Sequence, residues 1–235
     1  MLNSYFACFF LYLLVIQYHQ LNVNHFAHLR LTFVSQCGIL NRQKTIREGL
    51  IMKQNNRLST QDITQIGLMT AAIAVLAQIS IPMPAGVPMT MQTFAVPLAG
   101  ILLGARKGTF AVLAYLLLGA AGVPVYAGFA AGVGKLFGIT GGFLLSFPIM
   151  SWLAGKGEEK KSMPWLIASL VLGAVLNYII GMCWFVFVAE SNFAAAFTAC
   201  VLPFIPTAII KVLMAAFIGK ELRSALVKAQ VLKTA

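Results

Sequence analysis

The sequence predicts an all-α integral membrane protein with six transmembrane helices and irregular or re-entrant outer loops. Apolar residues make up 60% of its 235 residues and charged residues only 10%, which is typical of polytopic membrane proteins. Six apolar segments follow one another from residue 63 onward, separated by short polar or glycine-rich connections. The net charge of +11 lies mainly in those connections, so membrane topology explains it better than nucleic-acid binding does.

The first 51 residues differ from the rest of the chain. They hold all three histidines, and their one apolar run, 5–16, is too short to span a bilayer. From Met52 a short basic, polar stretch precedes the first apolar segment. We expect residues 1–51 to be either translated sequence upstream of the true initiator or a disordered extension, and residues 52–235 to form one membrane domain.

The first apolar segment, 63–81, carries small residues at spacings of three and four, which share one helix face: Gly67, Thr70, Ala71 and Ala74. Small residues let a second helix approach closely in lipid, where packing drives association. The face is a candidate docking surface for a partner subunit. Packing within the same subunit is the alternative, and the sequence alone does not distinguish the two.

The connection that follows, 82–92, contains three prolines and one glycine and is predicted to be a loop or partly re-entrant segment. Thr90 and Gln92 are two residues apart, so in an extended chain they would point the same way. Both are candidates for binding a ligand. The second segment, 93–105, is short, and Arg106-Lys107 is expected to close it.

Segments 108–122 and 142–155 flank a stretch, 119–142, that contains eight glycines. These glycines and Pro124 disfavour a regular helix, yet the stretch is too apolar for a solvated linker. Irregular backbone at membrane depth is tolerated where protein buries it or where it lines a cavity. We expect this stretch to form one wall of a ligand pocket, the alternative being a tight turn without a ligand role. Its candidate residues are Gly122, Tyr126, Gly128 and Lys135.

The last two segments, 163–188 and 193–218, each contain one notable polar residue. Lys211 is costly at membrane depth, about 2.5–3.5 kcal/mol, and such residues are commonly functional; snorkelling to an interface is the alternative. The prolines of the PFIP sequence, 203–206, should break or kink the chain just before it. Asn177 is a second candidate for the pocket, or an interhelical hydrogen-bond partner.

Charge counting predicts the orientation. If the segments alternate, eleven Lys and Arg residues counted from Met52 lie on one side of the membrane and Lys135 lies on the other. Under the positive-inside rule both termini are then cytoplasmic in the cell membrane. The 82–92 and 119–142 connections open to the outside.

Catalytic and metal-binding patterns are missing from the sequence. Beyond Met52 there is no histidine, and each acidic residue lies at an expected helix end or in a polar loop, so we expect neither an enzyme nor a metal site. The four cysteines show no CxxC spacing. The glycine-rich run 128–136 ends in Leu136 where a phosphate loop needs Ser or Thr. The chain should bind no ATP itself.

Three sequence blocks carry a resemblance to a known family. They read, in order, ISIPMPAGVPMTMQTFAVPLAGILLGARKG, YLLLGAAGVPVYAGFAAGVGKLFGITGGFLLSF and LPFIPTAIIK. This order resembles BioY, the biotin-binding S component of energy-coupling-factor (ECF) vitamin transporters. The resemblance implies a six-helix subunit that captures biotin outside the cell. It also implies partners: a transmembrane coupling subunit, which would dock on the Gly67–Ala74 face, and two ATP-binding subunits. No cofactor is implied, since only those partners use ATP.

The chain departs from the family pattern at a few positions. Ala208 stands where the family usually has an acid three residues before the lysine, Thr207 replaces a glycine, and Ile139 replaces a common proline. The resemblance implies that the acid and Lys211 would together bind the ureido ring, so its loss bears on ligand specificity. The alternatives to biotin uptake are an S component for another small vitamin and a structural membrane subunit without a ligand.

Overall fold

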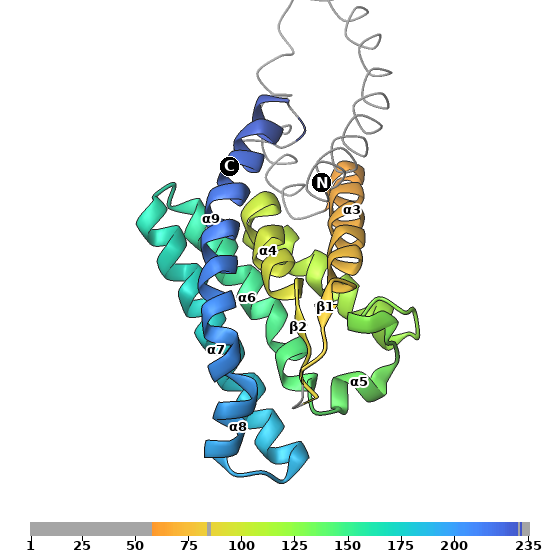
Figure 1. Ribbon diagram of the computed structural model, residues 1–235. Helices are drawn as coiled ribbons and strands as arrows, with labels where there is room; N and C mark the ends of the chain where they lie inside the picture. The colour runs from red at the N-terminus through yellow and green to blue at the C-terminus, as the bar shows by residue number, and fades with distance from the viewer. Residues whose placement is uncertain (1–57, 84–85, 230, 232–235) are drawn as a thin grey trace, which may run out of the picture. The chain divides into compact units, whose positions relative to one another are not determined.

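The computed structural model describes residues 58–83, 86–229 and 231, so the expectation for residues 1–51 lies outside the described residues. The described part is helical with one small β-ribbon (Figure 1). A turn inside α4 divides it in two, so the six expected helices are present. They are α3 (Thr60–Ala77), the two halves of α4 (Gln92–Ala120), α6 (Gly141–Glu159), α7 (Met163–Ala189) and α9 (Ile205–Lys228).

The first helix, α3, begins at a capping box in which Ser59 and Asp62 satisfy each other's backbone N–H groups. After α3, strands β1 (Ser80–Ile81) and β2 (Met89–Thr90) pair antiparallel, with Ser80 opposite Thr90. The connection expected as a loop is therefore partly an extended ribbon. Its second strand leads directly into α4 and brings Thr90 next to Gln92 at the start of that helix.

The second and third helices meet at Gly104, whose φ of 82° is a conformation that favours glycine. The chain folds back there: a Cβ on Gly108 would lie 2.7 Å from the Ala99 carbonyl oxygen. The expectation that Arg106-Lys107 closes the second segment was wrong by a few residues. The charged pair begins the third helix, because only the glycine can adopt the backbone of the turn.

Helices α4, α6 and α7 pack closely through small residues. A Cβ on Gly155 of α6 would lie 2.3 Å from the Ala105 backbone nitrogen, and one on Gly142 would lie 2.3 Å from the Trp184 side chain of α7. Any larger side chain would push these helices apart. The glycines therefore set the spacing of the bundle that surrounds the site.

The expected sixth segment is not one continuous helix. Helix α8 (Phe193–Cys200) ends before a 3₁₀ turn at Leu202–Phe204, and α9 then continues to Lys228, ten residues beyond the expected end at 218. The break confirms the effect expected of the PFIP prolines. It also places Lys211 in the second turn of α9, near the beginning of that helix rather than near its end.

One end of the bundle is held by charged groups. Arg223 of α9 lies 3.6 Å from the Glu158 carboxylate of α6 and donates to the carbonyl of Ile101 just before the α4 turn. Lys107 pairs with Asp62 at the beginning of α3. In Figure 1 this end lies at the top, where α3 begins and α9 ends. The stretches 92–120, 163–189 and 193–228 are each long and apolar enough to cross a membrane.

Candidate functional site

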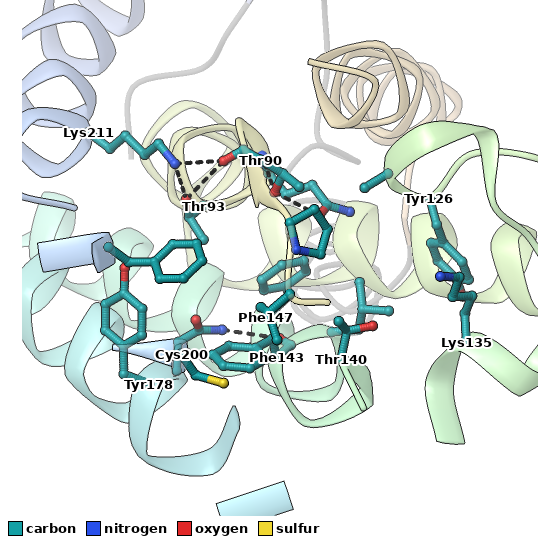
Figure 2. Close-up of a pocket in the computed structure, with 17 residues that line it drawn as sticks. Thr90, Thr93, Tyr126, Lys135, Thr140, Phe143, Phe147, Tyr178, Cys200 and Lys211 are labelled. Carbon is teal, nitrogen blue, oxygen red and sulfur yellow. Dashed lines mark hydrogen bonds between the residues drawn. The ribbon is translucent and has the colours of Figure 1, made fainter. Parts of the chain in front are cut away.

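A cavity of about 80 Å³ lies at the opposite end of the bundle, between the β-ribbon, the glycine-rich stretch and helices α4, α6, α7 and α9 (Figure 2). Gly122 and Gly128 do not line it; they adopt positive φ values of 100° and 68° in the backbone of the glycine-rich stretch. The other six candidates from the sequence do line it: Thr90, Gln92, Tyr126, Lys135, Asn177 and Lys211. A role of these residues in ligand binding stays a prediction.

Lys211 points into the bundle. Its ammonium donates hydrogen bonds to the Thr90 carbonyl oxygen at 2.7 Å and to Thr93 Oγ1 at 3.1 Å (Figure 2). The side chain is half-buried, so snorkelling does not describe its position. An ammonium carries three donors, and the third has no hydrogen-bond partner among the described residues. One donor of a charged group is thus left for a ligand.

Asn177 forms the hydrogen bonds between helices that the sequence left as one of its two expected roles. Its side chain is 2% exposed, and its amide nitrogen donates to the Phe143 carbonyl oxygen at 3.1 Å and to Ser146 Oγ at 2.6 Å, both on α6. These bonds use both N–H donors of the amide. Its oxygen has no partner within the described part of the chain. Because the residue also lines the cavity, that oxygen is available as an acceptor.

The glycine-rich stretch is irregular, as expected, with a 3₁₀ turn at Ala127–Phe129 and one short helix, α5 (Val133–Phe137), which carries the exposed Lys135. Tyr126 anchors it: its ring packs directly on Gly119, and its hydroxyl donates to the Leu116 carbonyl at 2.7 Å. The stretch therefore follows one side of the cavity and is attached to the third helix at Tyr126.

Gln78, at the end of α3, is a residue that sequence reasoning missed. Its amide nitrogen donates to the Val125 carbonyl at 3.2 Å, and its oxygen accepts from the Phe129 N–H at 2.8 Å. The side chain thus ties the first helix to the glycine-rich wall. A polar residue closing an otherwise apolar segment is a signal that could have identified it.

Sequence reasoning also missed the aromatic part of the lining. Phe143 and Phe147 are one turn apart on α6, directly after the glycine-rich stretch, and that spacing could have identified them. Tyr178 follows Asn177 in sequence, and Phe204 belongs to the PFIP break. Aromatic walls with a few placed polar groups are characteristic of small-molecule sites.

Comparison with known proteins identifies the family. The sequence matches the BioY family over residues 52–228. Biotin transporter BioY2 of Lactococcus lactis subsp. cremoris is 40% identical over 176 residues, which cover 74% of this chain and 94% of that protein. Biotin transporter BioY of Thermotoga maritima is 38% identical over 164 residues, covering 69% of this chain and 96% of that protein.

The chain belongs to the BioY family. A solved structure agrees: the crystal structure of the S-component for biotin from an ECF-type ABC transporter matches with a TM-score of 0.64 at 26% identity. The match covers 80% of this chain and 95% of that one. The six-helix fold expected for a BioY chain is thereby confirmed.

Ala208, where the resemblance led us to expect an acid, lies beside the candidate site. It lines a smaller cavity of about 10 Å³ together with Asn177 and Lys211. Among the described residues, no Asp or Glu lines this cavity or the larger one. The two lysines of the larger cavity, Lys135 and Lys211, thus lack a carboxylate partner in its walls.

Proposed function

We propose that this chain is the biotin-binding S component of an ECF-type transporter and takes part in biotin uptake across the cytoplasmic membrane. It is then a transport component and not an enzyme. The observation that carries the proposal is an aromatic-walled cavity with two lysines and no acidic residue among its described lining. Such a cavity favours a small, largely apolar anion.

Biotin has the matching chemistry. Its bicyclic ring is apolar, its urea provides two N–H donors and one oxygen acceptor, and its side chain ends in a carboxylate. Phe143 and Phe147 supply apolar surface. Lys211 keeps one N–H donor for an oxygen, and Asn177 keeps its oxygen for an N–H group.

The size of the cavity bears on how a ligand enters. At about 80 Å³ it is smaller than the roughly 300–1,000 Å³ of typical small-molecule sites. Biotin would therefore bind with an outward shift of the surrounding connections. The glycine-rich stretch is the part best suited to move, because its glycines at positive φ have no side chains to repack.

The partner subunits belong to the same proposal. Gly67, Thr70, Ala71 and Ala74 of α3 line a shallow groove of about 800 Å³ shared with the second half of α4. A Cβ on Gly67 would meet nothing within 4 Å, whereas the Thr70 hydroxyl turns inward and donates to the Ala111 carbonyl at 3.0 Å. The groove suits close approach of a helix from a transmembrane coupling subunit, with two ATP-binding subunits on the cytoplasmic side. Both termini would then be cytoplasmic.

Retention of radiolabelled biotin by the purified protein tests the function. Specific binding that unlabelled biotin displaces, and that biotin amide displaces more weakly, is the expected result, because the amide removes the negative charge. Displacement by another vitamin but not by biotin would support an S component of different specificity. Absence of retained label would contradict the proposal and favour a structural subunit.

A further inference from the structure

Tyr115 lies behind the cavity rather than in its wall. It is a residue of the third helix, its side chain is 0% exposed, and it is not among the residues that line the cavity. Its hydroxyl accepts a hydrogen bond from the Gln92 amide nitrogen and donates one to the Val125 carbonyl at 3.2 Å. One buried hydroxyl therefore joins the start of α4 to the glycine-rich stretch.

The direction of these bonds follows from the carbonyl. A carbonyl oxygen only accepts, so the Tyr115 hydrogen points to Val125 and the hydroxyl oxygen is left to accept from Gln92. The Gln92 amide must then turn its nitrogen toward Tyr115 and its oxygen toward Thr90. Thr90 Oγ1 donates to that oxygen at 2.9 Å.

The direction of these hydrogen bonds determines whether the polar groups at the cavity wall can donate to a ligand or accept from it. The Thr90 hydroxyl hydrogen is used by Gln92, and both the Thr90 hydroxyl and the Gln92 amide oxygen retain lone pairs. The Thr90 carbonyl is engaged by Lys211 at 2.7 Å. At this wall the Thr90 hydroxyl can only accept a hydrogen bond from a ligand, because its hydrogen is used, while Lys211 beside it only donates. The Gln92 amide presents its oxygen and one remaining N–H.

We infer that Tyr115 is a positioning residue that holds the Thr90 hydroxyl as an acceptor and so makes the site selective for a ligand with N–H donors, such as a cyclic urea. The inference rests on the proposed function and deepens it. Without the hydroxyl, the Gln92 amide has no bond that fixes its orientation. It can flip so that its nitrogen donates to Thr90, and the Thr90 hydrogen then turns toward the cavity as a donor.

Replacement of Tyr115 by phenylalanine tests the inference, with two ligands as probes: biotin, and cyclic carbamate analogues in which one ureido N–H is replaced by oxygen. The analogues match biotin in shape but present an acceptor in place of a donor. The parent protein should prefer biotin strongly over at least one of the two carbamate isomers, because a site built for an N–H group rejects a ligand that lacks it. Tyr115→Phe should reduce this preference about tenfold.

Thr109→Val is the matched control. Thr109 lies on the same helix as Tyr115 and its hydroxyl also donates to a backbone carbonyl, that of Ala105 at 2.7 Å, but it does not line the cavity or contact Gln92. In this variant the ratio of the two affinities should be retained whatever the change in each. If Tyr115→Phe lowers both affinities by one factor, or neither, Tyr115 has no positioning role. A parent protein that binds no biotin would contradict the proposed function instead.

Discussion

Lys211→Met should weaken biotin binding without unfolding the protein. Methionine has a similar length and is apolar, so it removes a charge that is costly at membrane depth while it keeps the packing of α9. The Thr90 carbonyl retains a hydrogen bond from Thr93 Oγ1 at 3.3 Å, so the start of α4 keeps part of its support. The variant should therefore insert and purify like the parent.

The expected loss of binding free energy follows from the one Lys211 N–H that has no partner among the described residues. A hydrogen bond to a charged group contributes about 1.5–3 kcal/mol, which corresponds to roughly a 10- to 150-fold rise in the dissociation constant. No described acidic residue lines the cavity, so the substitution leaves no unpaired anion in its walls. The predicted change is thus in ligand binding alone.

Titration of detergent-purified variants with biotin measures this change. Lys220→Met is the matched control, because it makes the same substitution on the same helix, outside the cavity lining, and should leave the dissociation constant unchanged. If Lys211→Met binds biotin as tightly as the parent, Lys211 serves structure alone. The ligand must then be held by the 82–92 and 119–142 connections.

Three further predictions concern the docking groove, the N-terminal residues and Ala208. Ala71→Trp should weaken co-purification with the coupling subunit, because a bulky side chain fills the groove. Biotin binding by the isolated protein should be unchanged. Unchanged co-purification would contradict the docking assignment. Deletion of residues 1–51 should leave biotin uptake by cells intact, since the family match and the cavity lie beyond them; loss of uptake by correctly inserted protein would refute this. In the same titration, Ala208→Asp should bind biotin as tightly as the parent or more tightly, because the carboxylate can share the donors of the Lys211 ammonium one turn away. A weaker affinity would show that the site excludes an acid.

Much of the fold follows from local properties of the sequence. Hydropathy and length mark the apolar segments, because a helix must be long and apolar to lie in a bilayer. Glycine and proline change the conformational preferences of the backbone at their own positions. The irregular stretch at 119–142 and the break before α9 were therefore predictable. The turn at Gly104 was misplaced because several glycines lie near Arg106, and their φ values depend on the packing around each of them.

The site depends on contacts between distant parts of the chain. By itself, the sequence identified Lys211 and Asn177 as polar residues at membrane depth, since composition alone makes them unusual there. The tertiary structure decided their partners: Lys211 meets Thr90 across 121 residues, and Asn177 meets Phe143 across 34. Tyr115 had no local signal at all, because its importance comes from lying between Gln92 and Val125. Hydrogen bonds require matched donors and acceptors at short range, and only the packing of the helices brings these groups within that range.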